Sequence, residues 1–563
     1  MTDKMDEKKG GLEEIRIGIF ICDCGTNIAG HIDCSAVTSY AATLPNVVYA
    51  KENLYTCSES GIAEIINGIK QHNLNRVVVA SCSPRTHQPL FQSSCSQAGM
   101  NPYLFEMANI RDQCSWVHMQ QREGGTEKAK DLVRMAAAKA AFLEPQKDIE
   151  ASLVARTLVI GGGVAGLSAA EGLAGMGIEV ILIEQKSELG GLLRQIDTLG
   201  PEGDKASERI SGLIGALKAC PNVTIHTDSK MQDIAGYIGN YDVTIHQEGR
   251  EEPIKEKVGC IVVATGALPL RPEGLFGYNG TNVITQIELE QMLKNKSFDA
   301  KDIVMIQCAG ARCKERQYCS RICCMIAVKN AMIIKKQNPG ANVHVLYRDM
   351  QMYGTEKEQM LWDARGMGVR FDIYDPDQPP EVKDGNVRFF QPLLGKPRDI
   401  SYDLVVLSTP MVPREDAPNL SQMMRVAIDQ NNFFMEAHAK LRPLDFATDG
   451  IFVAGSARYP ATVEEARSQG LGVASRVATI LFKDKLVTSA IVAEINPETC
   501  VGCLGCQQMC PYEAITYNPE LNACEVNTIL CKGCGCCAST CPSHSAQLKG
   551  FKPQQLLRQI RAV

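Results

Sequence analysis

The stretch Thr157-Leu-Val-Ile-Gly161-Gly-Gly163-Val-Ala-Gly166-Leu-Ser-Ala-Ala decides the fold of this chain. It reads as an apolar strand, a glycine turn and a helix of small residues, which is the first unit of a dinucleotide-binding domain. We expect Gly161 to permit the tight turn, Gly163 to let the backbone approach a pyrophosphate, and Gly166 to let the helix pack on the strand. The phosphates would lie at the N-terminus of the helix, where free N–H groups and the helix dipole favour an anion.

A second strand, Ile178-Glu-Val-Ile-Leu-Ile-Glu184, ends in a carboxylate suited to ribose hydroxyls. Three further segments favour FAD over NAD: Leu189-Gly-Gly191-Leu-Leu, Val262-Val-Ala-Thr265-Gly266 and Gly450-Ile-Phe-Val-Ala-Gly455. A domain that binds NAD alone is the alternative, and the four matching segments disfavour it. The set resembles the two-dinucleotide-fold flavoprotein reductases of the thioredoxin-reductase type. There the last segment continues with an Asp that binds the flavin ribityl chain, whereas this chain has Ser456.

The predicted FAD site takes residues from all of these segments. They lie in the glycine turn, after the acidic strand and at the carboxyl ends of two later strands, where ligands bind in parallel sheets. The expected residues are Gly161, Gly163, Val164, Ala165, Gly166, Glu184, Gln185, Gly191, Leu192, Ala264, Thr265, Gly266 and Gly455.

The amino-acid composition and net charge limit the classes of protein to which this chain can belong. The net charge of −6 and pI near 6.0 disfavour a nucleic-acid or anionic-membrane partner. The charged start Met1-Thr-Asp-Lys-Met-Asp-Glu-Lys-Lys-Gly10 lacks the apolar core of a signal peptide, and no apolar run is long enough to span a bilayer. We therefore expect a cytoplasmic protein without membrane insertion. Its 24 cysteines are then expected to be reduced, and their clustered spacing is typical of metal ligands.

Two cysteine runs near the C-terminus follow the spacing of a bacterial two-cluster ferredoxin, Cys-x2-Cys-x2-Cys-x3-Cys-Pro. In that pattern the fourth cysteine of each run ligates the other cluster. One [4Fe–4S] cluster should take Cys500, Cys503, Cys506 and Cys541, and the other should take Cys531, Cys534, Cys537 and Cys510. Cys536 lies off this spacing and is expected to be a bystander. Zinc ligation is the alternative, and eight cysteines at these intervals with both prolines make it remote.

Cysteines also replace a phosphate cradle in a second strand–loop–helix unit. The segment Ile303-Val-Met-Ile-Gln-Cys308-Ala-Gly-Ala-Arg-Cys313-Lys-Glu-Arg-Gln-Tyr-Cys319-Ser-Arg-Ile-Cys323-Cys324 opens with an apolar strand, as a nucleotide-binding unit should. Its loop then carries soft thiolate ligands where a flavin reductase has glycines for a nicotinamide cofactor. A two-electron carrier site is thus expected to be replaced by a one-electron carrier site.

Five amino-terminal cysteines each follow the carboxyl end of an expected strand: Cys22, Cys24, Cys57, Cys82 and Cys114. The strands are expected at Ile15–Cys22, Val47–Leu54, Arg76–Ala80 and Tyr103–Met107, in a sheet expected to be parallel, whose strand ends lie along one edge. Thiols gathered there would hold a further [4Fe–4S] cluster. Four ligands suffice, and we expect Cys24, Cys57, Cys82 and Cys114, with Cys22 as the alternative to Cys24. Buried or reactive thiols around an empty crevice are the competing interpretation.

These segments predict an α/β protein of three domains. Residues 1–147 form a small α/β domain, and residues 148–487 form a thioredoxin-reductase-like FAD domain of the Rossmann type with an inserted lobe at about 300–430. Residues 488–563 form a ferredoxin domain that binds two [4Fe–4S] clusters and ends in a helical tail. One FAD and three or four clusters are expected in all.

With these pieces assembled, the chain closely resembles the A subunit of heterodisulfide reductase and its non-methanogenic relatives. The matching segments are Cys22-Asp-Cys-Gly-Thr-Asn-Ile28, Val79-Ala-Ser-Cys-Ser-Pro-Arg85, Asn101-Pro-Tyr-Leu-Phe-Glu-Met-Ala-Asn-Ile-Arg111, Cys114-Ser-Trp-Val-His118 and Tyr318-Cys-Ser-Arg-Ile-Cys-Cys324. The resemblance implies that Cys308, Cys319, Cys323 and Cys324 ligate the cluster nearest the flavin, and that Cys313 does not. Longer members of the family carry an extra ferredoxin insertion, which residues 192–265 lack.

The resemblance also implies a cytoplasmic component of a larger complex that performs flavin-based electron bifurcation. The alternative is a relay and docking subunit that converts two-electron flow to single electrons without energy coupling. Expected partners are heterodisulfide-reductase-type B and C subunits, ferredoxin, a second copy of this chain, and a hydrogenase, formate dehydrogenase or NADH-oxidising module. A self-contained disulfide reductase needs a Cys-x-x-Cys pair beside the flavin, and the flavin domain has none.

Lys329 follows the last central cysteine by little more than one helical turn. A cation near the flavin N5 would stabilise reduced anionic flavin, so Lys329 is the expected flavin-contacting catalytic residue. An exposed helical lysine is the alternative.

Overall fold

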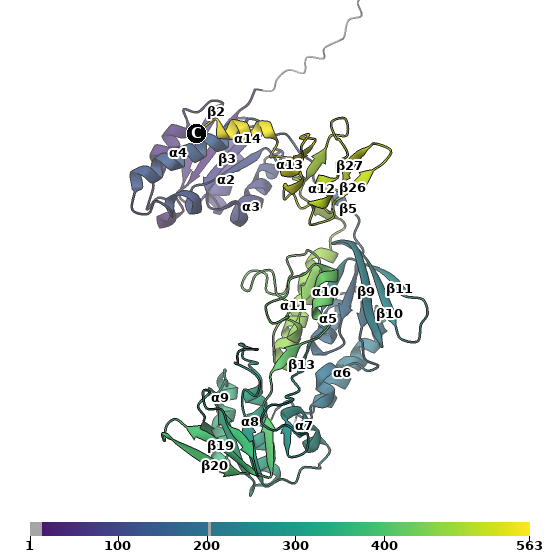
Figure 1. Cartoon of the computed structure of the whole chain (residues 1–563). Coiled ribbons are helices and arrows are strands. Elements are labelled where there is room, and N and C mark those ends of the chain that lie inside the picture. The colour runs from purple at the N-terminus through teal and green to yellow at the C-terminus, as the bar shows by residue number, and fades with distance from the viewer. Residues whose placement is uncertain (1–13, 201–203) are drawn as a thin grey trace, which may run out of the picture. The chain divides into compact units, whose positions relative to one another are not determined.

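The computed structural model describes residues 14–200 and 204–563 and divides into two compact units. One unit comprises residues 14–150 together with Val487–Val563, and the other comprises the described residues of Ala151–Leu486 (Figure 1). The expected ends of the domains at 147 and 487 agree with this division to within a few residues. The first and last expected domains, however, belong to one unit.

The amino-terminal domain is a parallel α/β layer, as predicted. Its sheet has the order β2-β1-β3-β4, and every pairing within it is parallel. The strands are β1 Ile17–Cys22, β2 Val47–Asn53, β3 Arg76–Ser81 and β4 Phe105–Asn109; the helices are α1 Cys34–Ala41, α2 Glu59–Gln71, α3 Pro84–Gln97 and α4 Arg122–Ala140. β1 and β3 are buried along their whole length, because apolar β-branched residues face helices on both sides of the sheet.

The ferredoxin module repeats a small motif twice. Each cysteine run includes a short helix, α12 Gly505–Gln508 or α13 Cys536–Thr540. Two antiparallel strand pairs lie against these helices: β25 Ala493–Ile495 pairs with β28 Ala546–Leu548, and β26 Ile515–Asn518 pairs with β27 Ala523–Val526. The repeat places the two cysteine runs in equivalent positions.

The C-terminal helix α14, Pro553–Ile560, joins this module to the amino-terminal domain. It lies beside α4 (Figure 1), and the buried Gln555 donates a hydrogen bond of 2.9 Å from Nε2 to the Phe142 carbonyl. Lys552 Nζ lies 2.8 Å from Glu144 Oε2, and the Lys139 ammonium lies 4.0 Å from the centroid of the Phe551 ring. These polar anchors explain why two domains at opposite ends of the sequence form a single unit.

The second unit contains two lobes. The FAD lobe has a five-stranded parallel sheet of order β23-β12-β6-β7-β8. Its strands are β6 Arg156–Ile160, β7 Glu179–Ile183, β8 Val223–His226, β12 Cys260–Val263 and β23 Ile451–Val453; its helices are α5 Val164–Gly175, α6 Ala206–Lys218 and α11 Val463–Leu481. A small sheet of β9 Ser229–Tyr237, β10 Asn240–Gln247 and β11 Ile254–Val258 covers part of one face. α5 packs against α11, so the two helices that begin at the glycine turn and at the last FAD segment share one core.

The other lobe has a parallel sheet of order β14-β21-β15-β16-β17. Its strands are β14 Val283–Thr285, β15 Asp302–Ile306, β16 Asn342–Tyr347, β17 Arg370–Ile373 and β21 Leu404–Leu407; its helices are α7 Gln286–Lys294, α8 Cys323–Gln337 and α9 Thr355–Gly366. The lobe begins before the expected residue 300, because β14 belongs to its sheet. It ends before 430, because α10, Ala417–Met424, packs in the core of the FAD lobe.

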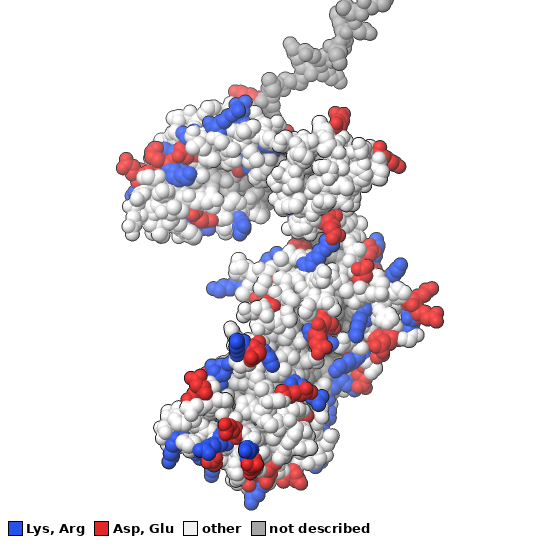
Figure 2. Space-filling model, viewed as in Figure 1, with Lys and Arg blue, Asp and Glu red and all other residues white. Residues whose placement is uncertain are grey.

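Acidic and basic side chains are mixed over the face of the molecule that Figure 2 shows, and no broad basic area gathers there. Among residues 14–200 and 204–563, no helix has the length and apolar character needed to cross a bilayer.

Candidate flavin and iron–sulfur sites

The glycine turn between β6 and α5 has the geometry that the sequence predicts. Gly161 has φ of 110°, in the left-handed region that favours glycine, and an added Cβ would lie 2.4 Å from the Ala264 carbonyl oxygen. At Gly166 an added Cβ would lie 1.9 Å from the Gly161 oxygen, so only glycine lets α5 pack this closely. At Gly163, the N-cap of α5, an added Cβ would meet nothing within 4 Å. The backbone there is open to a ligand.

Glu184 closes the other side of the turn. It follows β7 and is buried, and its Oε2 accepts a hydrogen bond of 2.8 Å from the Gly162 N–H. Its Oε1 accepts another of 2.9 Å from the Lys186 N–H. The carboxylate is therefore held at the mouth of the glycine turn, where the ribose of a dinucleotide would lie.

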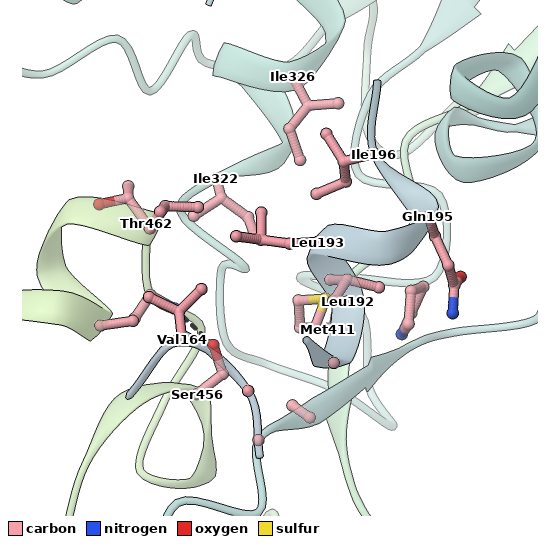
Figure 3. A pocket seen from close by; sticks show the side chains of 18 of the residues that line it. Val164, Leu192, Leu193, Gln195, Ile196, Ile322, Ile326, Met411, Ser456 and Thr462 are labelled. Carbon is pink, nitrogen blue, oxygen red and sulfur yellow. Dashed lines mark hydrogen bonds between the residues drawn. The ribbon is translucent and has the colours of Figure 1, made fainter. Parts of the chain in front are cut away.

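A cavity of about 290 Å³ opens from the glycine turn and runs between the two lobes of this unit. Its walls include ten of the thirteen residues expected at the FAD site: Gly161, Gly163, Val164, Ala165, Glu184, Gly191, Leu192, Ala264, Thr265 and Gly266. Gln185, Gly166 and Gly455 are not on the wall; Gly455 packs behind it, since an added Cβ there would lie 2.7 Å from Cβ of Ala165. Ser456, at the place of the usual Asp, does line the cavity (Figure 3).

The other wall of the cavity comes from α8 and the residue before it. Figure 3 shows Ile322 and Ile326 on this wall, with Leu193 and Ile196 of the FAD lobe opposite. The adjoining wall includes Cys323 and Lys329. An apolar wall with a few polar groups is typical of a cofactor site, and the first turn of α5, whose N–H groups have no partner within the helix, suits a dinucleotide phosphate.

Lys329 is buried, with 6% of its surface exposed, so the alternative of an exposed helical lysine is wrong. Its ammonium forms an ion pair with Glu290 Oε1 and donates a hydrogen bond of 2.8 Å to the Thr198 carbonyl. Glu290 also lines the cavity, is 1% exposed, and accepts from the Asp197 N–H at 3.2 Å. No local pattern marks Glu290 in the sequence, because it lies on α7 and meets α8 only in the folded lobe.

The structure brings the four central cysteines together at the N-terminus of α8. Burial, and then the neighbouring thiols of Cys324, Cys308 and Cys319, raise the pKa of the Cys323 thiol well above its ordinary value. Burial is also the main cause that raises the pKa of Cys324, to about 11. Cys308 has φ of 59°, and Cys319 Sγ accepts a hydrogen bond of 3.3 Å from the Arg321 N–H. Cys313 is not among the neighbours that raise the pKa of Cys323, and its thiol donates to the Gly310 carbonyl at 3.7 Å.

The loop from Gln307 to Ile322, which we call the thiol loop, is held in place by neighbouring strands. Tyr318 donates from its hydroxyl to the Met411 carbonyl at 2.8 Å, and the Met411 N–H donates to Ser320 Oγ at 2.9 Å. On the other side, Arg348 Nη1 donates to the Arg312 carbonyl at 2.9 Å. The loop is therefore an ordered part of the lobe, and its thiols at Cys308 and Cys319, with those of Cys323 and Cys324 at the start of α8, suit soft-metal ligation beside the cavity.

In the ferredoxin module the cysteines form the two crossed groups that their spacing predicts. Cys500, Cys503, Cys506 and Cys541 line one small pocket, and Cys510, Cys531, Cys534 and Cys537 line another. Backbone N–H groups donate to three of these sulfurs: Ala546 to Cys541 at 3.4 Å, Ala514 to Cys510 at 3.3 Å and Ala493 to Cys531 at 3.3 Å. Such donors are typical of thiolate ligands to iron–sulfur clusters, whose potential they tune.

Two further cysteines lie beside these pockets. Cys536 lines the pocket of Cys534, although its spacing is off the ferredoxin pattern. Cys524 is buried and lines the pocket of Cys506; burial, and then its contact with Cys506, raise its pKa to about 12. Each pocket therefore holds one thiol more than a cubane needs.

The amino-terminal domain gathers three of its four expected ligands. Burial raises the pKa of the Cys82 thiol, the Arg111 guanidinium opposes that rise, and the thiols of Cys24 and Cys57 add to it. Cys114 is set into the core behind them, where its thiol donates to the Gly125 carbonyl at 3.1 Å. Cys22, the alternative to Cys24, accepts a hydrogen bond of 3.4 Å from the Thr56 N–H.

In the part of the chain that the structure describes, no group of three or more His, Cys, Asp or Glu side chains is arranged to hold a single metal ion. Cluster ligation at the central and amino-terminal thiols stays a prediction.

Comparison with known proteins places these sites in a family. Residues 155–470 match the family model described as pyridine nucleotide-disulphide oxidoreductase, and residues 493–516 match that of the 4Fe-4S binding domain. Among solved structures, the chain is similar to thioredoxin reductase from T. acidophilum, with 16% identity, a TM-score of 0.41, and 59% of this chain and 100% of that one covered. Thioredoxin reductase from Lactococcus lactis gives 16% identity and a TM-score of 0.42 over 58% and 99%.

Curated relatives match nearly the whole chain. The second iron-sulfur A subunit of CoB–CoM heterodisulfide reductase from Methanopyrus kandleri is 37% identical over 89% of this chain and 91% of its own length. The A subunit of H(2):CoB-CoM heterodisulfide,ferredoxin reductase from Methanothermobacter marburgensis is 36% identical over 91% and 92%. The A subunit of ferredoxin:CoB-CoM heterodisulfide reductase from Methanosarcina mazei is 32% identical over 97% and 81%. The predicted fold class is confirmed, FAD and [4Fe–4S] clusters are supported as cofactors, and the chain belongs to the family of heterodisulfide reductase A subunits, which are oxidoreductase subunits.

Proposed function

We propose that this chain distributes electrons by flavin-based bifurcation, or its reverse, within a multi-subunit oxidoreductase complex. A bound FAD would supply two-electron chemistry and each [4Fe–4S] cluster one-electron chemistry, so that an electron pair from the donor could be divided between two chains of clusters at different potentials. The two electrons that leave the donor are thereby accounted for, one in each chain. The residues of this chain would hold the carriers at the sites described above.

The position of Cys323 carries this proposal. It lines the cavity that opens from the glycine turn, and it is also a neighbour of the other three central thiols. A cluster held by Cys308, Cys319, Cys323 and Cys324 would therefore lie directly beside a flavin bound in the cavity. That arrangement suits single-electron exchange between the two, whereas a nicotinamide cofactor would need the same space.

We further propose that the chain carries three or four clusters. Two would lie in the crossed pockets of the ferredoxin module, and one at the central thiols. The fourth would lie at Cys24, Cys57, Cys82 and Cys114, with Cys22 as the alternative to Cys24. The influence of the Cys24 and Cys57 thiols on the pKa of Cys82, which shows that both lie near it, supports this fourth site.

Lys329 is proposed to act at the flavin. Its burial, its place on the cavity wall and its ion pair with Glu290 support this role. A buried ammonium beside the flavin would stabilise its reduced, anionic form, and Glu290 would hold that ammonium in position.

The partners are proposed from the names of the relatives. Those names refer to heterodisulfide, ferredoxin and H2, so we propose a cytoplasmic complex with heterodisulfide-reductase-type B and C subunits and with ferredoxin. A hydrogenase, formate dehydrogenase or NADH-oxidising module would supply the electrons. A second copy of this chain is expected in the complex.

Iron analysis and a redox titration test the proposal on the purified, anaerobic protein. Four cubanes require about sixteen iron atoms per chain and three require about twelve. About twelve iron atoms per chain would rule out the amino-terminal cluster, and about eight would also rule out the central cluster. In the titration, we expect the bound flavin to change its absorption in one two-electron step; two well-separated one-electron steps would support the simple relay instead.

A further inference from the structure

Arg321 stands in an unusual backbone conformation between two of the central cysteines. Its φ is 64°, in the left-handed region that residues with a Cβ seldom adopt, and its N–H donates to Cys319 Sγ at 3.3 Å. A conformation of this kind persists only when surrounding contacts hold it. Those contacts are made by the guanidinium.

The guanidinium of Arg321 reaches the FAD lobe. Nη1 donates to the Pro460 carbonyl at 3.2 Å, and Nη2 lies 2.6 Å from Glu465 Oε1. The guanidinium also lies 5.0 Å from the centroid of the Tyr459 ring and 5.4 Å from that of Tyr353, whose hydroxyl accepts from Nη2 at 3.1 Å. Tyr353 belongs to the same lobe as the thiol loop, so one side chain bridges the two lobes.

Glu465 links this contact to the flavin cavity. Its second oxygen, Oε2, accepts from the Thr462 N–H at 2.9 Å, and Thr462 Oγ1 accepts from the Glu465 N–H at 3.2 Å, which forms the capping box of α11. Thr462, Val463 and Ala466 of the same turn line the cavity. The ion pair between Arg321 and Glu465 therefore joins the thiol loop to the N-terminus of α11, and the hydrogen bond to Pro460 adds to this link.

We propose that Arg321 is a positioning residue that sets the spacing between the flavin and the central cluster. It does so by fixing the thiol loop against the first turn of α11. Because electron tunnelling slows exponentially with distance, a small displacement of either wall would change the rate of exchange. Arginine suits this role because its planar fork contacts Glu465 and Pro460 at once, whereas lysine offers a point charge. The inference rests on the proposed function of the cavity and the thiols.

Two substitutions break the link from opposite sides. Arg321→Gln removes the charge from the thiol loop. Glu465→Gln removes the partner's charge but keeps the capping box, because glutamine also serves at that helix position. Arg321→Lys keeps the charge without the fork. Arg467→Gln is the matched control: it removes an arginine from the same helix whose ion pair, to Glu171 Oε2 at 3.9 Å, stays within the FAD lobe.

The measurements are iron content, hydrogen exchange of residues 462–466, and the rate at which reduced methyl viologen bleaches the bound flavin. Arg321→Gln and Glu465→Gln should keep their iron, exchange faster at the start of α11, and bleach roughly tenfold more slowly or worse. Arg321→Lys should fall between these and the wild type, and Arg467→Gln should match the wild type. Wild-type bleaching and exchange in both glutamine variants would overturn the inference.

The inference can fail while the proposed function stands. If Cys308→Ser lowers the iron content but the two glutamine variants bleach at the wild-type rate, only the role of Arg321 is wrong. If Cys308→Ser leaves the iron content unchanged, the central cluster itself is wrong, and the bleaching rate no longer reports on Arg321. With the iron content unchanged in Cys308→Ser, faster hydrogen exchange in the two glutamine variants would still show that Arg321 links the lobes. The proposed role of Arg321 in the spacing between flavin and cluster would nevertheless be overturned.

Discussion

The loops after β6 and β15 show two different ways of connecting a strand to a helix in the same local fold. Each follows a buried parallel strand and leads into a helix, α5 or α8. The first loop is a short glycine turn that leaves the N-terminus of α5 open to the cavity. The second, from Gln307 to Ile322, is long and carries thiols to the N-terminus of α8. Under the proposed function, the same strand–loop–helix frame serves a dinucleotide in one lobe and a metal cluster in the other, and the loop sets which of the two is bound.

The two loops also differ in what holds them. The glycine turn is fixed by close backbone contacts that exclude any side chain at Gly166. The thiol loop is fixed by side chains, through Tyr318, Ser320 and Arg321. Substitutions should therefore damage the first loop through packing and the second through lost hydrogen bonds and ligands.

The largest effect is expected at the glycine turn. Gly166→Ala places a methyl group 1.9 Å from a carbonyl oxygen, so we expect a loss of at least about 1–3 kcal/mol in the free energy of unfolding of the FAD lobe, and loss of FAD. Gly163→Ala is the control, since its methyl group meets no protein atom within 4 Å. It should weaken FAD binding while leaving the urea midpoint of the apoprotein unchanged. Equal midpoints for both variants would contradict the packing role of Gly166.

The next effect is expected in the thiol loop. Cys308→Ser should lower the iron content by about four atoms per chain and remove one cluster's paramagnetic resonance signal, while FAD and the ferredoxin clusters stay bound. Cys313→Ser, in the same loop but outside the thiol group, should keep the wild-type iron content. The assignment of Cys308, and not Cys313, as a cluster ligand fails if both variants lose iron equally or if neither variant loses iron.

A smaller effect on the bound cofactors, although not on stability, is expected at Lys329. Lys329→Ala leaves the buried Glu290 carboxylate without its cation, which costs about 3–5 kcal/mol of folding free energy. Adding Glu290→Gln removes the stranded charge and should restore much of that stability, as chemical unfolding can measure. Both variants should lower the flavin potential if Lys329 contacts the flavin. An unchanged potential would leave Lys329 with a structural role only.

The sequence predicted those features of the fold and of the sites that depend on short-range patterns of residues. The glycine turn, Glu184 and the crossed ferredoxin groups follow from local spacing, and the cavity and pockets gather nearly all of those residues. The four parallel strands of the amino-terminal domain were also predicted from their apolar runs.

Such local patterns do not predict contacts between segments that are distant in the sequence. Arg321 and Glu465 are 144 positions apart, and nothing local marks either as a partner of the other. The burial of Lys329 depends on Glu290 from another helix, and the single unit formed by the two ends of the chain depends on α14. Cys114 shows the same limit, because its thiol is directed into the core by packing around Gly125.

The most direct test of the central claim, that the loop after β15 serves a cluster and not a dinucleotide, is an anaerobic reduction of the isolated protein. NADH, NADPH and reduced methyl viologen are added separately, and the absorption of the bound flavin is followed. We predict that reduced methyl viologen bleaches the flavin rapidly and that neither nicotinamide nucleotide does. Rapid bleaching by NADH or NADPH would show that this loop still cradles a dinucleotide, and would contradict the claim.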